Sequence, residues 1–573
     1  MGVIQFKEAN CKNCYKCIRS CPVKAIAFQD DQAKIIEEAC TLCGSCLLVC
    51  PQNAKTVVSD LEKVKGFINK NEKVYVSLAP SFVSAFKVKD EKTFFHALKS
   101  LGFTHVEETA AGASFVSMEY EKLIKEKKMR NIITTACPSI VYLVEKYYPE
   151  VIEDLAPVVS PMIAHAKMMK CMYGPRIKVV FIGPCISKKE ECNDLQNQGL
   201  VDAVITFEEL EKWFESENID INECGELENK SIKNAAARFY PVPGGILKTI
   251  GIPERKNYRC VSIDGIDRCM SILDSIKKGE TKNYFIEMNN CAGGCLGGPC
   301  IKSLTGGYLE ARDRLIEYVK KSARNTGTDI LQDAKVNLSK VFVNLSKEDK
   351  MPNEDTIREI LSKTGKFTKE QELNCGACGY STCREKAIAV YNNKAQIYMC
   401  LPYMRERAES ISNIILHSTP NAIIALNKEL KIQEYNFTAR TLFKFDSEDM
   451  HGRYIYEILD CSDFIEVRET EQNILNRKFY YEKYDVTVEQ SIIYVKEHDL
   501  IVAFIRDITR EEKQNQKIYR VKCETVDIAQ KVIEKQMRVA QEIASLLGET
   551  TAETKVILTK LKNSILSETG DSK

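Results

Sequence analysis

The sequence predicts a multidomain protein that combines α/β and α+β domains. The chain has 573 residues, which is enough for roughly three to five domains. Apolar, β-branched runs that end in loops predict a buried parallel sheet in the middle of the chain. Short strands separated by turns predict an α+β domain in the last third. The 24 cysteines gather mainly in the first 400 residues.

Composition excludes several classes of protein. The 81 Lys and Arg residues balance 80 Asp and Glu residues, and a net charge of +1 gives no reason to expect nucleic-acid binding. The longest apolar runs, such as 421–426 and 499–505, are far shorter than the ~20 residues of a membrane helix. The first ten residues do not resemble a signal peptide. We therefore expect a cytoplasmic protein without a membrane partner, whose reduced cysteines bind metal rather than form disulfides.

Residues 1–58 carry the same cysteine spacing twice. Each run has the form C-x2-C-x2-C-x3-C-P, which is typical of a two-cluster bacterial ferredoxin. In such ferredoxins the fourth cysteine of each run ligates the other cluster. The predicted ligands of one [4Fe–4S] cluster are Cys11, Cys14, Cys17 and Cys50, and those of the second are Cys40, Cys43, Cys46 and Cys21. The alternative is a pair of zinc sites, since four thiolates also suit zinc.

In residues 59–345, three apolar runs end in loops that contain proline. The runs are Val74–Leu78, 132–135 and 179–182, and they predict buried parallel strands. Ligands of such sheets lie beyond the carboxyl ends of the strands. The cysteines of these loops and of FIEMNNCAGGCLGGPC are therefore expected to form one metal site: Cys137, Cys185, Cys291 and Cys295. The alternative is that each is an ordinary buried thiol.

Three of these segments, IITTACPSI, GPCISKKEE and EMNNCAGGCLGG, resemble the TSCCP, MPCxxKxxE and ExMxCxxGCxxGG motifs of the [FeFe]-hydrogenases. The resemblance covers about residues 1–345. It implies a hydrogenase domain with parallel sheets and an H-cluster, in which a [4Fe–4S] cube is joined to a diiron site carrying carbon monoxide, cyanide and an azadithiolate bridge. The four cysteines would bind the cube, and Cys295 would bridge to the diiron site.

The resemblance also implies residues that face the diiron group. Lys188 stands three residues after Cys185, and its ammonium would donate a charge-assisted hydrogen bond to a cyanide. Other residues match the remaining cofactor-facing loops of the family: Ala79, Pro80, Ser81, Ser160 and Pro161.

One departure from the family pattern affects catalysis directly. Ala136 stands where catalytic members have a cysteine that carries protons to and from the bridging amine. A methyl group can neither donate nor accept a proton, so low turnover is expected. Glu119 and Glu121 are only loose counterparts of the family's relay carboxylates, and we expect them to be solvated.

Other departures concern packing. Gly183 and Asn289 replace methionines of the family, and we expect looser or wetter packing around the diiron site. Cys300 stands where the third motif is shortened, and burial is its expected role.

Residues 346–404 contain a further set of cysteines, Cys375, Cys378, Cys383 and Cys400. The spacing CxxCx4Cx16C predicts a third [4Fe–4S] module, with a helix over 384–398 that leads back to Cys400. Zinc is the alternative, because spacing alone does not separate the two metals.

Residues 405–508 resemble a PAS domain. Residues 421–443 predict strand, turn, strand and a short helix opened by Asn436, and further strands are expected at 490–495 and 500–506. The DIT sequence at 507–509, leading into a charged helix, is typical of the family. The alternative is an unrelated α+β dimerisation domain.

The tail, residues 509–573, is charged and helical. Apolar residues from Ile518 to Leu546 fall close to a heptad seam, which predicts a dimeric coiled coil. The alternative is a helix that packs on the preceding domain. No phospho-acceptor box, P-loop or basic recognition helix follows, so a signal would have to pass through a partner.

Together these features resemble the sensory [FeFe]-hydrogenases of groups C and D, which also carry the CxxCx4Cx16C module and a PAS domain. The resemblance implies an H2 sensor that slowly and reversibly oxidises H2 to protons and passes electrons through its clusters. A redox partner, a signalling kinase or phosphatase and a second copy of the chain are the expected partners. The alternatives are an ordinary bidirectional hydrogenase and a diiron-free electron-transfer or iron–sulfur assembly protein.

Overall fold

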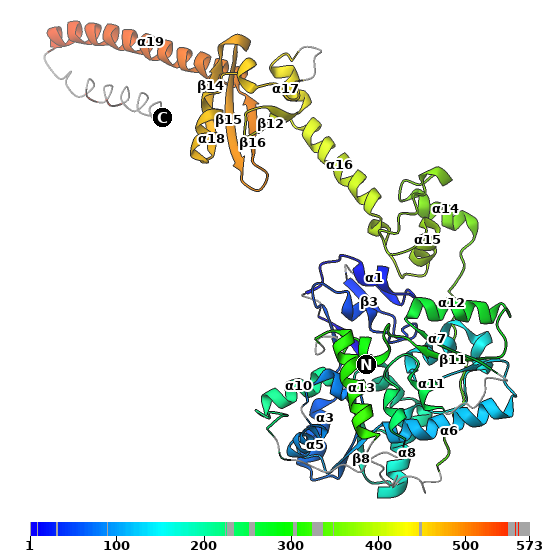
Figure 1. Cartoon of the computed structure of the whole chain (residues 1–573). Coiled ribbons are helices and arrows are strands. Elements are labelled where there is room, and N and C mark those ends of the chain that lie inside the picture. The colour runs from blue at the N-terminus through cyan, green and yellow to red at the C-terminus, as the bar shows by residue number, and fades with distance from the viewer. Residues whose placement is uncertain are drawn as a thin grey trace. The chain divides into compact units, whose positions relative to one another are not determined.

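The computed structural model describes most of the chain, namely residues 2–7, 10–29, 32–88, 90–223, 225, 234–250, 258–301, 306–323, 336–347, 349–445, 450–547, 556 and 560. It divides into two compact units, Met1–Met404 and Arg405–Lys573 (Figure 1). Within the described residues, no helix is both long and apolar enough to cross a bilayer. Most of the predicted tail after residue 547 lies outside the described residues.

The first unit begins with the ferredoxin-like domain. Its elements are β1 (Ile4–Phe6), α1 (Lys16–Ser20), β2 (Ile26–Gln29), β3 (Gln32–Ile35), α2 (Ser45–Leu48) and β4 (Lys55–Val57). Strand β1 pairs with β4, and β2 pairs with β3, both antiparallel. Ile18, Ile26 and Phe28 are buried between these elements, because so small a domain has few other apolar side chains for its core.

Two parallel sheets form the centre of the unit. The first has the order β6-β5-β8-β9, and the second has the order β10-β11-β7. Their strands are β5 (Val74–Leu78), β6 (His105–Glu108), β7 (Ile132–Ile133), β8 (Lys178–Gly183), β9 (Ala203–Thr206), β10 (Arg259–Asp264) and β11 (Tyr284–Asn289). All neighbouring pairs are parallel. The predicted parallel strands at 74–78 and 179–182 are therefore confirmed, whereas the run 132–135 is a strand only over its first two residues.

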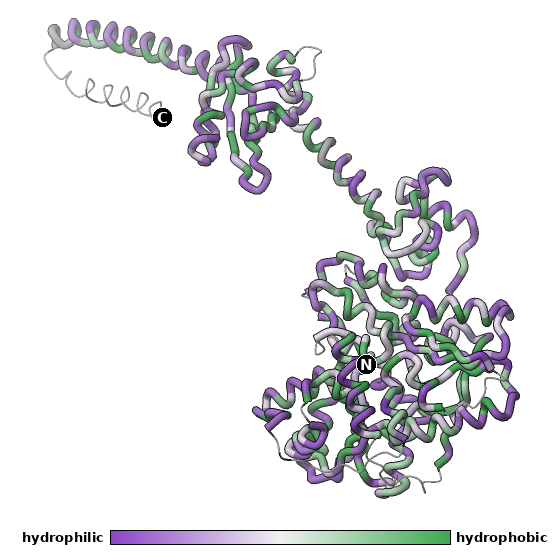
Figure 2. The backbone as a smooth tube through the Cα atoms, in the orientation of Figure 1, coloured by the Kyte–Doolittle hydropathy of each residue, from purple (hydrophilic) through white to green (hydrophobic). Residues whose placement is uncertain are grey.

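Helices cover these sheets, and their bounds follow the chain: α3 (Leu61–Asn69), α4 (Phe82–Ala85), α5 (Glu91–Ser100), α6 (Ala110–Glu126), α7 (Pro138–Tyr147), α8 (Pro161–Tyr173), α9 (Ser187–Glu191), α10 (Phe207–Ser216), α11 (Gly245–Thr249), α12 (Ile266–Lys277) and α13 (Tyr308–Ser322). Figure 2 shows the hydrophobic segments gathered along the strands of this unit, whereas the outer helices alternate between polar and apolar residues. The sheets are apolar on both faces because helices leave neither face to solvent.

Residues 346–404 form a small module of two helices, α14 (Glu354–Ser362) and α15 (Cys383–Tyr391). Helix α15 starts after Thr382, whose hydroxyl accepts from the Glu385 amide. The expected helix over 384–398 is wrong in its second half. It ends at Tyr391, because Asn393 adopts a left-handed conformation with φ of 55°.

The module packs against the ferredoxin-like domain. The Phe28 amide donates to the Lys394 carbonyl at 3.0 Å, and Arg19 donates to the Ala377 carbonyl at 2.9 Å. Gly379 has φ of 99° and lies so close to Ile18 that a Cβ there would be 2.7 Å from the Ile18 side chain. Only glycine fits this contact without strain.

The second unit is reached through α16 (Leu401–Ser418). Its elements are β12 (Ala422–Asn427), β13 (Ile432–Tyr435), α17 (Phe437–Leu442), α18 (Ser462–Thr470), β14 (Ile474–Tyr481), β15 (Val486–Val495), β16 (Leu500–Asp507) and α19 (Thr509–Leu547). The antiparallel sheet has the order β13-β12-β16-β15-β14. The predicted strands and the helix capped by Asn436 are present, and β14 was not predicted.

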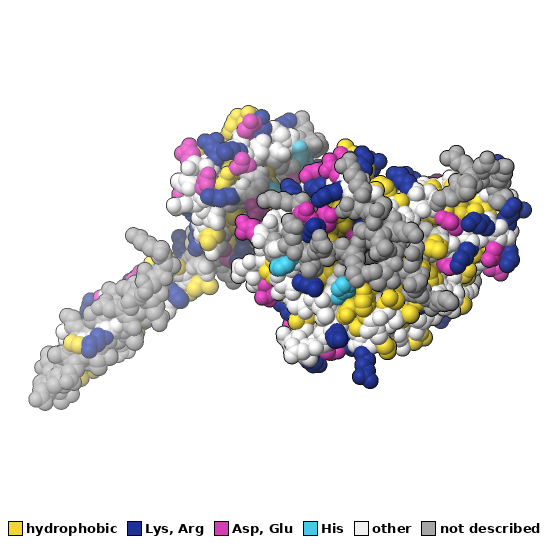
Figure 3. All heavy atoms as spheres, turned by 60° about the horizontal axis from the view of Figure 1, so that its bottom comes forward, with side chains coloured by type: hydrophobic (Ala, Val, Ile, Leu, Met, Phe, Trp, Pro, Cys, Tyr) yellow, Lys and Arg dark blue, Asp and Glu magenta, His cyan; other side chains and the backbone are white. Residues whose placement is uncertain are grey.

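On the face drawn in Figure 3, the described residues form no extended patch of one charge. Lysine and arginine side chains are interspersed there with aspartate and glutamate. This agrees with the balanced composition of the chain.

Candidate metal centre

Four cysteines from three distant loops line a single cavity at the carboxyl ends of the parallel strands. Cys137, Cys185, Cys291 and Cys295 all line this cavity. We call it the cysteine cavity. The structure thus brings the four predicted cube ligands together. Cys43, a predicted ligand of the ferredoxin-like domain, lines the same cavity.

The local backbone geometry places these four thiols on the wall of the cysteine cavity. Cys137 precedes helix α7, with Pro138 at its first turn, and Cys185 follows Pro184 at the end of β8. Gly294 has φ of 69°, and a Cβ there would lie 2.4 Å from the Pro241 carbonyl oxygen. The same carbonyl accepts a 2.7 Å hydrogen bond from the Cys295 amide. Glycine is therefore required where the chain turns between Cys291 and Cys295.

A second, larger cavity adjoins the first and is partly shared with it. Lys188 lines it, so we call it the lysine cavity. Cys137, Cys185 and Cys295 line both cavities, whereas Cys291 lines only the cysteine cavity. Further predicted residues on its wall are Ala79, Pro80, Ser81, Ala136 and Pro161.

Ser160 is the predicted cofactor-facing residue that does not line the lysine cavity. Its hydroxyl instead donates to Glu191 Oε2 at 3.0 Å. The Lys188 ammonium donates to the same oxygen at 2.7 Å and to the Ala136 carbonyl at 3.3 Å. Lys188 and Glu191 are 7% and 2% exposed, so this is a buried ion pair that fixes a positive charge on the cavity wall.

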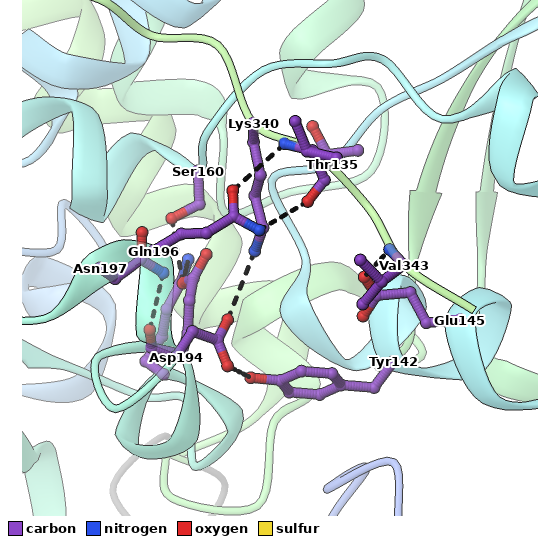
Figure 4. A network of polar contacts seen from close by, with 12 residues as sticks. Thr135, Tyr142, Glu145, Ser160, Asp194, Gln196, Asn197, Lys340 and Val343 are labelled. Carbon is purple, nitrogen blue, oxygen red and sulfur yellow. Dashed lines mark hydrogen bonds and ion pairs between the residues drawn. The ribbon is translucent and has the colours of Figure 1, made fainter. Parts of the chain in front are cut away.

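A wider polar network supports this wall from the outside (Figure 4). Asn197 donates to the Glu191 backbone carbonyl at 2.8 Å. Asp194 accepts from the Tyr142 hydroxyl at 3.2 Å and pairs with Lys340 at 3.4 Å. The segment around Lys340 is thereby fastened beside helix α9, which carries Lys188.

The chemistry of the lining fits an anionic metal group. Burial, followed by the charges of Cys185, Cys137 and Cys295, raises the pKa of the Cys291 thiol well above its ordinary value. Burial also raises the pKa of Cys137 and Cys295. Because the thiolates repel each other in a buried space, a bound metal cluster is what would stabilise them together.

Unpaired polar atoms point to the same conclusion. The buried side-chain oxygens of Ser81, Ser139 and Asn290 have no hydrogen-bond partner within the described part of the chain. Ser81 lines the lysine cavity, and Ser139 and Asn290 line the cysteine cavity. Buried polar atoms normally have a partner, so a bound polar group is expected to supply it.

The departures from the hydrogenase motifs have clear structural settings. Gly183 does not loosen the packing as expected, because the Phe181 ring lies 2.7 Å from where a Cβ would stand. Asn289 donates to Glu287 at 3.3 Å and lines both cavities.

Cys300 is 2% exposed and packs in the core of the ferredoxin-like domain. Glu119 and Glu121 are half-buried and pair with Lys122 and Lys125 on α6.

Cysteines from the two runs of the ferredoxin-like domain lie close together. Burial, together with the charges of Cys43 and Cys40, raises the pKa of Cys21 to about 12. Burial and the charges of Cys43, Cys40 and Cys21 also raise the pKa of Cys46. The fourth cysteine of the first run thus lies among the cysteines of the second run, as the ferredoxin spacing predicts. Burial and the charge of Cys11 also raise the pKa of Cys17, so these two cysteines of the first run lie near each other.

The third set of cysteines lines a cavity of its own. All four predicted ligands line it: Cys375, Cys378, Cys383 and Cys400. Two buried lysines, Lys366 and Lys386, also line it, and Lys366 Nζ donates to Cys400 Sγ at 3.3 Å. Among the residues that the structure describes, no three His, Cys, Asp or Glu side chains lie close enough together to hold a single metal ion.

Several wall residues of the lysine cavity carry no motif. They include Thr109, Phe181, Ala237, Tyr240 and Pro241. Thr109 follows β6 directly, so the rule that ligands lie beyond the ends of parallel strands could have indicated it. The other residues had no comparable signal.

Comparisons with known proteins agree with this geometry. Residues 72–299 match the family described as "Iron only hydrogenase large subunit, C-terminal domain". The chain contains an iron-only hydrogenase-like domain. Residues 3–69 match the "4Fe-4S dicluster domain" family, and residues 371–402 match the family described as "Putative Fe-S cluster". The hydrogenase-like domain is thus flanked by two iron–sulfur segments.

Individual relatives of the hydrogenase-like domain are distant. Iron hydrogenase 1 of Clostridium pasteurianum is 26% identical over 43% of this chain and 53% of that protein. The NADP-reducing hydrogenase subunit HndD of Solidesulfovibrio fructosivorans is 26% identical over 48% and 57%. This chain spans about half the length of these relatives. The cytosolic Fe-S cluster assembly factor NAR1 of Yarrowia lipolytica is 21% identical over 37% and 50%.

Among solved structures, a variant of the [FeFe]-hydrogenase HydA1 from Chlamydomonas reinhardtii aligns with 51% of this chain and 100% of that chain. The TM-score is 0.41, and the sequence identity is 17%.

Proposed function

We propose that this chain is an H2-sensing [FeFe]-hydrogenase that binds and slowly, reversibly oxidises H2. The observation that carries the proposal is the pair of adjoining cavities, which share Cys137, Cys185 and Cys295 and have the buried Lys188 on the wall. In this proposal the cysteine cavity holds the [4Fe–4S] cube, and the lysine cavity holds the diiron group with its CO, CN and azadithiolate ligands.

The residues of the lysine cavity bind and orient that group. When bound, it supplies the reversible splitting of H2 into protons and electrons. Cys295 lines both cavities and is the proposed bridge. The Lys188 ammonium and the unpartnered Ser81 hydroxyl donate hydrogen bonds to its anionic ligands. The surrounding apolar wall keeps bulk water away from the site.

Low turnover follows from Ala136. Its methyl group lies on the wall of the lysine cavity, at the position of the family's proton-carrying cysteine. Without a titratable group there, proton transfer limits the rate. A protein that responds to H2 rather than consuming it tolerates this loss.

Electrons leave through the iron–sulfur domains. Cys43 lines the cysteine cavity, so the second ferredoxin cluster would adjoin the cube. Burial and the charges of Cys378 and Cys21 raise the pKa of Tyr380. This residue of the third module therefore lies near a cysteine of its own module and a cysteine of the ferredoxin-like domain. The proposed path therefore runs from the cube through the second ferredoxin cluster, which Cys43 and Cys21 would both ligate, to the third cluster, and a redox partner exchanges electrons with it.

The second unit is the proposed PAS sensor. Its strand order is β13-β12-β16-β15-β14. Strands β12 and β13 lie on one side of β16, the last strand of the sheet along the chain, and β14 and β15 lie on its other side. This order supports the proposal. The DIT segment at 507–509 also supports it. Thr509, the first residue of α19, accepts from the Thr487 amide at 2.9 Å, which ties the helix to β15. This contact would pass a change in the sheet to α19.

Helix α19 is the proposed dimerisation and output element. Apolar side chains along it are exposed: Ile518, Val521, Ile528, Val532, Val539 and Ile543. Figure 2 shows hydrophobic residues recurring along the helix between polar ones. A second copy of α19 would cover this stripe as a coiled coil. The dimer would then signal to a partner kinase or phosphatase.

Infrared spectroscopy tests the function. After the full-length protein is loaded with the diiron group, CO and CN bands should appear, and they should change under H2 and return under argon. Bands that do not respond to H2 would refute a role in H2 chemistry.

A second candidate function is supported by the relatives. The match to an Fe-S cluster assembly factor supports a protein that keeps its cubes but never binds diiron. In that case no CO or CN bands would appear in protein whose iron–sulfur clusters are fully occupied.

A further inference from the structure

A continuous chain of buried hydrogen bonds leads away from the wall of the lysine cavity. It begins at Thr109, on the cavity wall, and ends at His105, whose side chain is 33% exposed. We propose that Thr109, Ser77, His165 and Glu107 conduct protons between the lysine cavity and solvent and so replace the route lost at Ala136. This inference rests on the proposed function, because it assigns the path for the protons of that reaction.

The inner part of the chain consists of two hydroxyls. Thr109 Oγ1 and Ser77 Oγ lie 2.8 Å apart, and either can donate. Ser77 lies on β5 and is fully buried, and Thr109 is 5% exposed. A hydroxyl both donates and accepts, so each can pass a proton on without holding a charge.

His165 forms the centre of the chain. Its Nδ1 lies 2.8 Å from Ser77 Oγ, and its Nε2 lies 3.2 Å from Glu107 Oε2. The ring is fully buried on α8. An imidazole with one partner on each nitrogen can take up a proton at one nitrogen and release one from the other.

Glu107 forms the outer end. Its Oε1 accepts from His105 Nε2 at 2.9 Å and from the Tyr173 hydroxyl at 2.5 Å. Burial raises the pKa of Glu107, but the hydrogen bonds from His105, His165 and Tyr173 outweigh it and hold that pKa well below the ordinary value. The carboxylate is therefore ionised at neutral pH and orients the His165 ring through Nε2, and as a weak base it would carry a proton only transiently before losing it to water.

The transfer balances atom by atom. A proton that reaches Thr109 Oγ1 releases the proton already there to Ser77 Oγ. Ser77 in turn gives its own proton to His165 Nδ1. His165 loses its Nε2 proton to Glu107, and the Glu107 carboxyl passes it to water beside His105. One O–H or N–H bond breaks for each that forms. The hydroxyls then rotate back, whereas His165 is left with its proton on Nδ1, so a second outward proton follows only after the ring has exchanged that proton for one on Nε2.

The same contacts could serve only to satisfy buried polar groups, so the test must separate conduction from structure. Ser77→Ala and His165→Gln break the chain at two different points. Ser84→Ala is the matched control, because Ser84 is equally buried but donates to the Ala311 carbonyl at 2.7 Å, outside the chain. Each variant is made in the full-length protein and loaded with the diiron group.

We expect Ser77→Ala and His165→Gln to lower H2 oxidation at least tenfold, while the infrared CO and CN bands keep their intensity and frequency. Ser84→Ala should leave the rate unchanged. Unchanged rates in both chain variants with loaded cofactor would overturn the proposal.

A second measurement needs neither the cofactor nor activity. In the cofactor-free protein, nitrogen-15 NMR of the histidine rings reports exchange of the His165 N–H with water, and the signal is assigned by its loss in His165→Gln. We expect exchange to slow at least tenfold in Glu107→Gln and to stay the same in Ser84→Ala. Equal exchange in Glu107→Gln and wild type would also overturn the relay. If the wild type takes up no diiron group, the proposed function fails, and this measurement alone decides whether the chain conducts protons.

Discussion

At the scale of single residues, Lys188 and its neighbour Lys189 offer a direct comparison. Both ammonium groups are buried and paired with a carboxylate, Glu191 for the first and Glu209 for the second. Only Lys188 lines the lysine cavity. Removing Lys188 takes the counter-charge from the buried Glu191, at a cost of about 3–5 kcal/mol, whereas Glu209 is half-buried and also accepts from the Thr206 amide, so removing Lys189 costs less.

We predict that Lys188→Met prevents retention of the diiron group, whereas Lys189→Met does not. The infrared intensity of the CO and CN bands per iron–sulfur cluster measures retention. Equal band intensity in the two variants would show that Lys188 acts only in folding.

Ala136→Cys is predicted to raise H2 turnover at least tenfold, because a thiol at this position can carry protons that the methyl group cannot. The rate is measured per loaded diiron group. An unchanged rate would mean that proton transfer at this position does not limit the enzyme.

Glu287 makes stability depend on pH. Burial outweighs the hydrogen bonds from Leu247 and Gly244, and raises the pKa of this carboxyl to about 7. The folded state therefore holds a proton between about pH 4.5 and pH 7 that the unfolded state has lost, so stability falls as pH rises through this range. The expected loss is of order 3 kcal/mol.

The Glu287→Gln variant keeps the shape of the protonated acid and cannot ionise. We predict that it is more stable than the wild type at pH 8 and similar at pH 5, by chemical denaturation of the first unit. The same pH dependence in both proteins would contradict the raised pKa.

At the scale of elements, the parallel strands explain how much of the site the sequence could predict. The apolar runs that became β5, β7 and β8 ended in loops with cysteine or proline, so the strands, Cys137 and Cys185 could be predicted, whereas Cys291 and Cys295 follow β11 and were predicted from the spacing of their own segment. Tyr240 and Pro241 could not, because they come from a segment without a motif and reach the cavity only through tertiary packing. Strand β14 was missed because its burial does not alternate regularly.

The third iron–sulfur module allows a test of electrostatics. Lys366 is 8% exposed, and its ammonium donates to Cys400 Sγ, so it should stabilise the reduced and more negative cluster. We predict that Lys366→Met lowers the reduction potential of this cluster, measured by an EPR redox titration. The control is Lys363→Met, since Lys363 is exposed and pairs with Glu359 in the same module. Equal shifts in both variants would exclude a specific contact.

At the scale of the whole molecule, the exposed stripe of α19 predicts a dimer. Ile528 lies in the middle of this stripe and is 62% exposed. An Ile528→Asp substitution would place a carboxylate in the seam of a coiled coil, where burying it unpaired is unfavourable. We predict that the wild type sediments as a dimer and the variant as a monomer in analytical ultracentrifugation. Gln530→Asp adds the same charge at the heptad position opposite the seam and should remain dimeric. A monomeric wild type would contradict the coiled coil.

The central claim is that the cysteine and lysine cavities together hold an iron–sulfur cube joined to a diiron group. Its most direct measurement combines iron content per chain with the infrared spectrum, before and after loading, in the wild type and in Cys295→Ser. The account predicts that the wild type gains two iron atoms per chain together with CO and CN bands, and that Cys295→Ser gains neither. A wild type that gains no iron and no bands while all its iron–sulfur clusters are present would contradict the account.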